Sequence, residues 1–126
     1  MMETLELTHW KKYLIEFAKE RDWEQFHTPK NLAAALSVEA SELLEIFQWL
    51  TEEESFKAKN DPVLREKIGD EIADVLVYMI RLATRLEINI PQALELKMKK
   101  NALKYPTDLC RGSIRKYTEL KHPAKQ

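Results

Sequence analysis

Two short acidic motifs have the residue types and spacing that could support chemistry in this sequence. Glu39 and Glu42 lie three residues apart in a mostly apolar stretch, and Glu71 and Asp74 repeat that spacing about thirty residues later. Residues three or four apart share one face of a helix, so each pair projects together if its stretch is helical. If the two helices pack against each other, the four carboxylates converge, and the pattern then predicts a metal site.

An aromatic residue follows each acidic pair at helical spacing. Trp49 lies seven residues after Glu42, and Tyr78 lies seven residues after Glu71. Because seven residues make about two turns, each ring lies on the face of its carboxylate, roughly 10 Å along the axis. This arrangement predicts a flat surface for a ring-shaped ligand beside the metal.

The acids also narrow the choice of metal and ligand. Carboxylates set in apolar helix faces need positive charge, and an all-oxygen donor set favours Mg²⁺, with Mn²⁺ as a substitute, over zinc. A di-iron bundle would need Glu-x-x-His repeats, whereas the three histidines lie outside both motifs. Since Mg²⁺ commonly binds carboxylates together with substrate phosphates, we expect a nucleotide ligand. The acids alone leave open that these are ordinary amphipathic helices.

Helices are the elements that must position these residues. The chain has 126 residues with two glycines and 44% hydrophobic residues, and β-branched residues do not alternate with polar ones, which predicts an all-α bundle of four to five helices. Capping residues and prolines place the helices at about residues 8–24, 28–50, 61–86 and 89–105, with an exposed connection over residues 51–60. Thr8 is the expected cap of the first helix. Gly69, inside the third, indicates close approach of a neighbouring helix.

The segment Val75–Ile80 is apolar on every side of the predicted third helix. A helix of this kind is buried all round, and one domain with about four helices can hardly enclose it alone. We therefore expect an oligomer whose interface covers the spare face.

Length and composition predict one domain over residues 1–126, with a helical core at about 8–105 and a basic tail at 106–126. The tail, which contains Lys116, Lys121 and Lys125, is expected to be disordered or laid along a neighbouring subunit. A net charge of −1 gives no field that would attract a nucleic acid polymer or a membrane. No apolar run approaches the ~20 residues of a membrane span, and no signal-peptide pattern is present. The single cysteine, Cys110, is expected to be an ordinary thiol in a reducing, cytoplasmic compartment.

Aromatic residues also gather after the first predicted helix. Trp23, Phe26 and His27 lie in a helix end and loop, where aromatic residues indicate binding more strongly than in a helical stripe. The alternative is that Trp23 and Phe26 close the end of the bundle, and the sequence leaves both open. On the last helix Lys97 and Asn101 share a face, which is either solvated or directed toward a ligand.

Longer segments resemble a known family. Together with the acidic motifs, four segments are similar to the all-α nucleoside triphosphate pyrophosphohydrolases of the MazG-like superfamily, and most similar to its dCTP pyrophosphatase branch. These segments are Phe17–Leu32, Glu42–Trp49, Asp70–Met79 and Arg115–Leu120. The similarity extends in order from about Trp10 to Leu120.

The resemblance implies hydrolysis of a deoxynucleoside triphosphate to the monophosphate and pyrophosphate for nucleotide pool sanitation, with dCTP and base-modified dCTP favoured. It implies a homotetramer built as a dimer of dimers. The expected catalytic and Mg²⁺-binding residues are Glu39, Glu42, Glu71 and Asp74. The expected substrate-binding residues are Trp23, Gln25, Phe26, His27, Trp49, Tyr78, Lys97 and Asn101.

At one position the sequence differs from the vertebrate members of this branch. Vertebrate members of this branch carry a nucleotide-contacting histidine nine residues before the tryptophan matched by Trp23, and that position here is Leu14. The base preference is therefore open, and a pyrophosphatase for another nucleotide, such as dUTP, is an alternative. A helical module that binds nucleotide without turnover is a second alternative. Glu45, one turn after Glu42, is a further candidate for reaching the metal or holding a water beside it, but it is not counted among the expected ligands.

Overall fold

The computed structural model describes residues 3–115 and residue 118. Contacts divide the chain into two compact units, one ending at Ile88 and the other starting at Asn89, and we describe each by itself. Across the described residues all regular structure is helical, which confirms the predicted all-α class. None of these helices combines the length and the apolar character that a membrane crossing requires. The expectation of a single domain over residues 1–126 stays a prediction.

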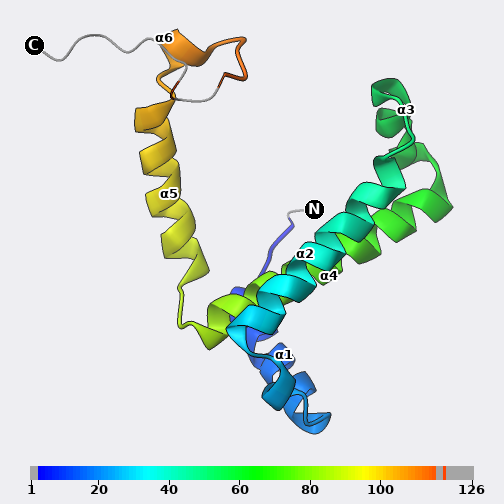
Figure 1. Cartoon of the computed structure of the whole chain (residues 1–126), viewed down its shortest axis with the longest axis vertical. Helices are drawn as coiled ribbons and strands as arrows, with labels where there is room; N and C mark the ends of the chain where they lie inside the picture. The colour runs from blue at the N-terminus through cyan, green and yellow to red at the C-terminus, as the bar shows by residue number, and fades with distance from the viewer. Residues whose placement is uncertain (1–2, 116–117, 119–126) are drawn as a thin grey trace, which may run out of the picture. The chain divides into compact units, whose positions relative to one another are not determined.

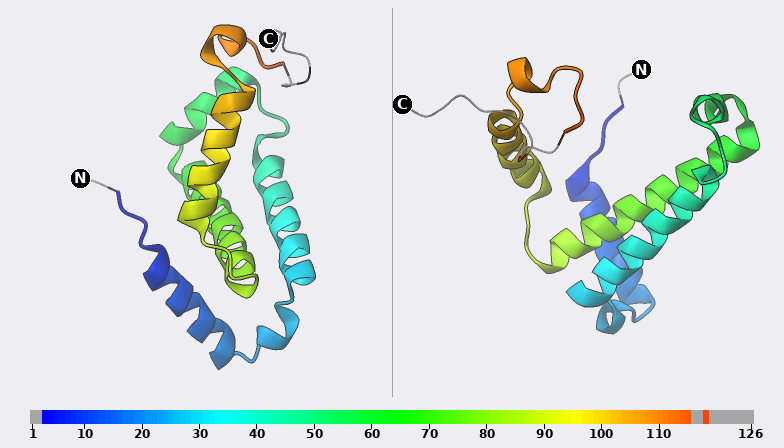
Figure 2. Two further views of the ribbon diagram at one scale, coloured as in Figure 1. Left: turned by 90° about the vertical axis from the view of Figure 1, so that its left-hand side faces the viewer. Right: turned by 45° about the horizontal axis from the view of Figure 1, so that its top comes forward.

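The first unit is built on two long helices. Its elements, in chain order, are α1 (Leu7–Glu20), η1 (Glu24–Phe26), α2 (Pro29–Phe47), α3 (Glu52–Lys57), η2 (Ala58–Asn60) and α4 (Pro62–Arg85). Helices α2 and α4 run antiparallel and side by side, with α3 and η2 in the connection between them, and α1 packs against α4 (Figures 1 and 2). The antiparallel pairing sets the middle of α2 beside the middle of α4. These are the parts of the two helices that carry the acidic motifs.

Side-chain caps explain why three helices begin where the sequence predicts. The Thr28 hydroxyl accepts the backbone N–H of Asn31 at 3.2 Å at the start of α2. The side chains of Asp61 and Asn89 cap α4 and α5 (Ile90–Lys104) in the same manner. Each cap satisfies N–H groups that the first helical turn leaves without partners, and a proline with a suitable φ follows in that turn.

The predicted ends of the first helix are wrong. Helix α1 begins at Leu7, with Glu6 as its N-cap residue, so Thr8 lies inside the first turn and not at the cap. The helix ends at Glu20 and not near residue 24. Asp22 adopts a left-handed backbone conformation with a φ of 54°, which a right-handed helix cannot continue.

The connection over residues 51–60 is mostly exposed, as predicted, but it forms α3 and η2 and is not a loop. A capping box starts α3: the Glu54 N–H donates to the Thr51 hydroxyl at 3.1 Å, and the Thr51 N–H donates to the Glu54 carboxylate at 3.4 Å. Two orphan N–H groups are thereby satisfied, which explains why so polar a segment forms a turn of helix. The threonine and the acid three residues later were a readable signal. Helix α2 also ends three residues early, at Phe47.

Gly69 does not mark a close approach of helices within the described chain. It is exposed on α4, and a Cβ at this position would meet no atom within 4 Å. No helix of the described chain therefore packs against Gly69, so the expected close approach is not found within the single chain.

The first unit buries few of its apolar side chains. The buried ones are Leu14 and Ala18 of α1, Leu32 of α2, Ala58 of η2 and Ile80 of α4. Within the apolar segment Val75–Ile80 only Ile80 is buried, and Met79 is 47% exposed. The isolated chain thus leaves part of this segment uncovered, which agrees with the expected interface, and the oligomeric state stays a prediction.

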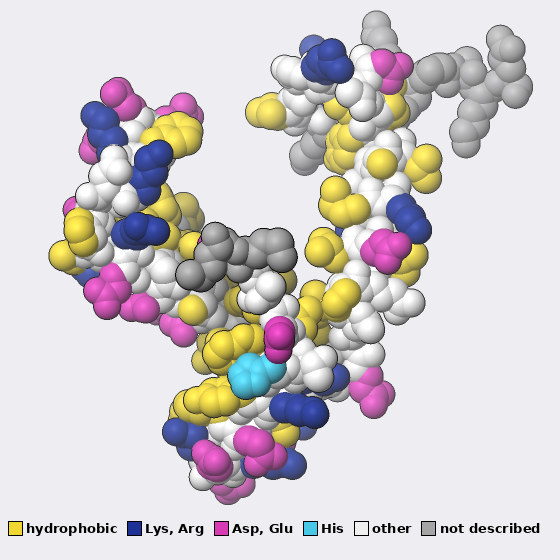
Figure 3. Space-filling model, turned by 180° about the vertical axis from the view of Figure 1, so that it is seen from behind, with side chains coloured by type: hydrophobic (Ala, Val, Ile, Leu, Met, Phe, Trp, Pro, Cys, Tyr) yellow, Lys and Arg dark blue, Asp and Glu magenta, His cyan; other side chains and the backbone are white. Residues whose placement is uncertain are grey.

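The second unit contains α5 and the short helix α6 (Thr107–Cys110). Apolar side chains are exposed along α5 (Figure 3), and they include Leu94, Leu96, Met98 and Leu103. The start of the expected tail is helical at α6, where Cys110 is half-buried. The expectations for Lys116, Lys121, Lys125 and most of Arg115–Leu120 fall outside the described residues.

Candidate functional site

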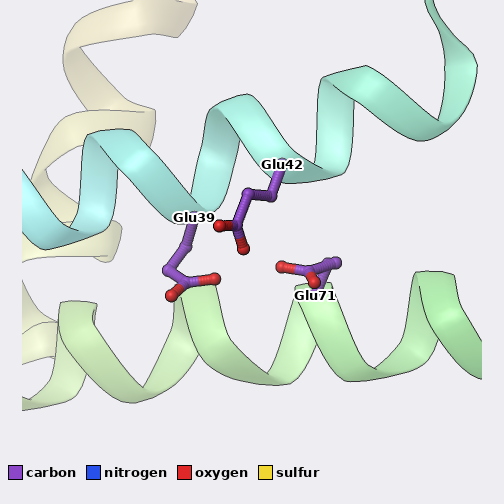
Figure 4. A group of neighbouring side chains, drawn as sticks. All are labelled: Glu39, Glu42 and Glu71. Carbon is purple, nitrogen blue, oxygen red and sulfur yellow. The ribbon is translucent and has the colours of Figure 1, made fainter.

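Three of the four predicted acids converge between the two long helices. Glu39 and Glu42 project from α2 and Glu71 projects from α4, and the side chains point toward one another (Figure 4). Each contributes a carboxylate oxygen to a group whose members all lie within 4.8 Å of one another. The i, i+3 spacing on α2 and the antiparallel packing on α4 together produce this cluster.

The cluster has the electrostatics of a cation site. One oxygen of Glu39 and one of Glu71 are buried with no hydrogen-bond partner among the described residues. Burial raises the pKa of Glu39 to about 7, and the nearby carboxyls of Glu42, Glu71 and Asp74 add to the shift. Buried carboxylate oxygens without partners are costly unless a cation binds them. An all-carboxylate donor set fits a hard cation such as Mg²⁺.

A hollow of about 450 Å³ opens beside this cluster. Its lining residues are Glu42, Glu45, Ile46, Lys67, Asp70 and Glu71. Glu45 therefore shares a solvent-accessible space with two of the converging acids, as its helical spacing predicts, and its part in metal binding stays a prediction.

Asp74, the fourth predicted acid, lies beside the three-residue cluster and also borders a second cavity. Its charge contributes to the raised pKa of Glu39. It also contributes, after burial and Glu39, to the raised pKa of Tyr78. Asp74 therefore connects the acidic cluster with an aromatic pocket one helical turn further along α4.

The aromatic pocket has a volume of about 350 Å³, within the range of small-molecule sites. Its walls are Trp10, Tyr13, Leu14, Phe17, Ala18, Trp23, Val77 and Tyr78, and its polar residues are His27, Asp74 and Arg81. The pocket thus combines aromatic surface with a few polar groups, which is the composition expected for a site that binds a planar ring.

A backbone turn after α1 places Trp23 in this pocket. The positive φ of Asp22 reverses the chain, and the Trp23 N–H donates to the carbonyl of Ala18 at 2.9 Å. The indole then packs edge-to-face on Phe17, with ring centroids 5.9 Å apart, and meets the His27 ring at 6.2 Å. Of the two interpretations that the sequence left open, the structure favours a pocket wall for Trp23.

Arg81 is a pocket residue that the sequence interpretation missed. It is only 2% exposed, and its Nε donates to His27 Nδ1 at 3.4 Å, at the long end of the hydrogen-bond range. Burial, followed by the charges of Arg81 and Arg85, lowers the pKa of His27, which favours the neutral imidazole. The readable signal was a cation that directly follows the apolar segment Val75–Ile80, three residues after Tyr78 and on the same face.

Other predicted substrate-binding residues lie outside this pocket. Trp49 follows the end of α2 and is 87% exposed, and Phe26 is also exposed. The Gln25 amide donates to Asp22 instead, to its backbone carbonyl and its carboxylate at 3.0 Å.

Lys97 and Asn101 lie on α5, in the second unit. Lys97 is exposed, whereas Asn101 is half-buried and its amide donates to Met98 Sδ at 3.9 Å. The functional roles expected for all these residues stay predictions.

The chain is similar to proteins that are named pyrophosphatases. The dCTP pyrophosphatase 1 proteins of Homo sapiens and Bos taurus are 49% and 48% identical to this chain over 109 residues. Each match covers 86% of this chain and 64% of the relative, so the chain spans less than two thirds of the length of these curated relatives. The crystal structure of a pyrophosphatase from Archaeoglobus fulgidus has a TM-score of 0.75 and 40% identity, covering 84% of this chain and 97% of that one.

The sequence model of the MazG-like family matches residues 34–120. The matched region contains both acidic motifs, all of α4 and most of α2. By this match, and by the shared fold of the archaeal pyrophosphatase, the chain belongs to the MazG-like family.

Proposed function

We propose that this chain hydrolyses deoxynucleoside triphosphates, with dCTP and base-modified dCTP favoured, to the monophosphate and pyrophosphate in nucleotide pool sanitation. One observation carries the proposal: an acidic cluster with buried, unpartnered oxygens stands next to an aromatic pocket of about 350 Å³, and Asp74 borders both. A nucleotide needs this combination, because its phosphates attract a cation and its base stacks on aromatic rings. The relatives named dCTP pyrophosphatase 1 support the choice of dCTP.

Mg²⁺ would be held by Glu39, Glu42, Glu71 and Asp74, and Mn²⁺ is the expected substitute. The orphaned oxygens of Glu39 and Glu71 support this ligand set. When bound, the ion supplies positive charge that offsets the charge of the phosphates during the reaction.

The chain's own residues orient the reactants. Trp23 and Tyr78 line the pocket that would hold the nucleoside. Carboxylate oxygens of the cluster that remain free accept hydrogen bonds from the attacking water and so orient it toward the triphosphate. The bond between the α and β phosphates is broken, which leaves the monophosphate and pyrophosphate.

Further parts of the proposal concern assembly and the remaining residues. We propose a homotetramer, built as a dimer of dimers, and the apolar side chains exposed on α4 and α5 support an assembly that covers them. Trp49, Gln25 and Phe26 would complete the nucleoside site, and Lys97 and Asn101 would steady the triphosphate. A cytoplasmic location agrees with the single cysteine.

Product analysis tests the reaction. Purified protein with Mg²⁺ is given each canonical deoxynucleoside triphosphate, and nucleotide products and pyrophosphate are resolved by chromatography. Monophosphate with pyrophosphate, fastest from dCTP, is expected. If the same products form fastest from a nucleotide with another base, such as uracil, the reaction is supported and the choice of dCTP is overturned. Tight binding without product would support the alternative of a binding module.

A matched pair of variants tests the acidic cluster. Glu71→Gln removes one charge from the converging carboxylates and is expected to lower kcat/KM by at least about 100-fold, because metal-assisted charge stabilisation is worth several kcal/mol. Glu66→Gln makes the same change on an exposed residue of α4 and is expected to leave activity unchanged. Full activity in Glu71→Gln would refute the metal assignment.

A further inference from the structure

Arg81 is a buried cation that forms no close ion pair in the part of the chain that the structure describes, where Glu24 is the acid whose charge acts on it. The side chain is 2% exposed, and Nη2 is buried with no hydrogen-bond partner among those residues. No described carboxylate forms an ion pair with it within 4 Å. A buried guanidinium nitrogen without a hydrogen-bond partner is costly, so Nη2 is available to an acceptor from outside the described chain.

The position of Arg81 indicates where that partner binds. Arg81 lines the aromatic pocket together with His27. Arg81 Nε donates to His27 Nδ1 at 3.4 Å, so this imidazole nitrogen is an acceptor and the neutral ring carries its proton on Nε2. A guanidinium has no acceptor atom. The N–H groups that remain on these two side chains can therefore only donate hydrogen bonds.

The order of residues along α4 assigns one end of the site to the base. Glu71 belongs to the acidic cluster, Asp74 lies between the cluster and the pocket, and Arg81 follows ten residues after Glu71. At 1.5 Å per residue this separates Glu71 and Arg81 by about 15 Å along the axis. A nucleotide whose phosphates are drawn to a cation at the acids places its base toward Arg81.

We propose that Arg81, together with His27, binds the acceptor edge of the nucleobase and so favours cytosine over thymine and uracil. This inference rests on the proposed function, and it adds a residue that determines base specificity. Cytosine presents two neighbouring acceptors, the ring nitrogen N3 and the carbonyl oxygen O2. In thymine and uracil N3 carries a hydrogen, which would face the donors of the pocket and leave buried groups unpaired.

Binding of nucleoside monophosphates tests the inference without requiring turnover. Trp10 and Trp23 line the pocket, so tryptophan fluorescence can report titrations with dCMP and dTMP in the full chain without metal. In Arg81→Met we expect dCMP binding to weaken on the order of 10- to 100-fold, as for loss of a hydrogen bond to a charged donor. Binding of dTMP should weaken less, so the preference for dCMP over dTMP should shrink.

Two further variants serve as controls. Arg85→Met removes the same charge one helical turn later from an exposed position and is expected to leave the dCMP preference unchanged. Arg81→Lys keeps the charge but loses the planar fork of donors, and it is expected to restore only part of the preference.

Thermal unfolding separates a binding role from a structural one. If Arg81 is unpaired until a base arrives, replacing it with an apolar side chain of similar length should maintain or raise the Tm of the ligand-free protein. A lower Tm with an unchanged ratio of dCMP to dTMP affinity would overturn the inference and assign Arg81 to a structural ion pair, as with a neighbouring subunit. Failure of the wild-type chain to hydrolyse any triphosphate would refute the proposed function, while the binding ratio would still test the role of Arg81.

Discussion

At the scale of single residues, the site depends on charges that the chain by itself does not neutralise. The acidic cluster leaves oxygens of Glu39 and Glu71 unpartnered, and the pocket leaves Arg81 Nη2 unpartnered. The two carboxylate oxygens need a cation, whereas the guanidinium nitrogen needs a hydrogen-bond acceptor. A nucleotide bound with a divalent cation would satisfy both, which explains why such groups are tolerated in a small domain.

The raised pKa of Glu39 predicts how metal binding depends on pH. Its pKa is raised from an ordinary 4.5 to about 7, so ionisation is disfavoured in the folded chain. Its contribution to the stability of the metal-free protein is fully present below pH 4.5 and is lost as the pH rises through about 7. A cation needs the ionised carboxylate, so the gain in Tm on adding Mg²⁺ should grow between pH 6 and pH 8.

Thermal unfolding with and without Mg²⁺ at pH 6, 7 and 8 checks this expectation. In Glu39→Gln, which cannot ionise, the gain from Mg²⁺ should be small at every pH. A gain in the wild type that is independent of pH would contradict the assignment of Glu39 as a ligand.

The pocket wall formed by Trp23 predicts a loss of nucleotide affinity on truncation. Trp23→Ala should weaken dCMP binding by roughly 5- to 100-fold, because stacking of a base on an aromatic side chain is worth about 1–3 kcal/mol. Isothermal titration calorimetry measures the change. Phe56→Ala, which truncates an exposed aromatic residue on α3, should bind dCMP like the wild type, and equal affinities in both variants would refute the role of Trp23.

At the scale of elements, the α2–α4 pair is the scaffold of the site. The caps at Thr28 and Asp61 fix where the two helices begin, and the connection through α3 returns the chain antiparallel. The register of the pair then decides which turns face each other. Because both acidic motifs lie near the middle of their helices, away from the fraying ends, the carboxylates are held by well-formed backbone.

Gly69 on α4 offers a test of this scaffold. A Cβ would meet no atom of the described chain within 4 Å, and glycine costs roughly 0.5–1 kcal/mol relative to alanine inside a helix. Gly69→Ala should therefore stabilise the protein by up to about 1 kcal/mol in urea unfolding. Loss of stability would show that an atom from outside the described single chain packs against this face.

At the scale of the whole molecule, the described chain leaves more large apolar side chains exposed than it buries. The exposed apolar residues occur in both units, on α4 in the first and along α5 in the second. Surfaces of this kind mark interfaces. The proposed assembly is therefore expected to contribute a substantial part of the stability of each subunit.

Charge placed on the apolar face of α4 should disrupt the assembly. Met79 is 47% exposed in an otherwise apolar segment, and burying a lysine there against another subunit would be costly. Met79→Lys should reduce the mass measured by sedimentation equilibrium relative to the wild type. Glu66→Lys introduces a lysine at an exposed polar position of α4 and should leave the measured mass unchanged. A monomeric wild-type protein would refute the proposed tetramer.

The sequence alone determined the helical class, the starts of three helices and the pairing of acids on one face of each long helix. These features depend on local rules, such as caps, prolines and residues three apart sharing a face, and such rules act within a few residues. The capping box at Thr51 and Glu54 is equally local, so the start of α3 is also predictable from the sequence.

Only the tertiary structure decided which residues meet across helices. Trp49 and Tyr78 occupy similar positions after their acids, yet Tyr78 lines the aromatic pocket and Trp49 is exposed beyond the end of α2. The residue type of Arg81 does not show that it is buried. Its burial follows from the packing of α1 and the turn at Trp23 around the same pocket. Burial and register are properties of packed elements, because the free energy of a buried charge depends on neighbours that are distant in the chain.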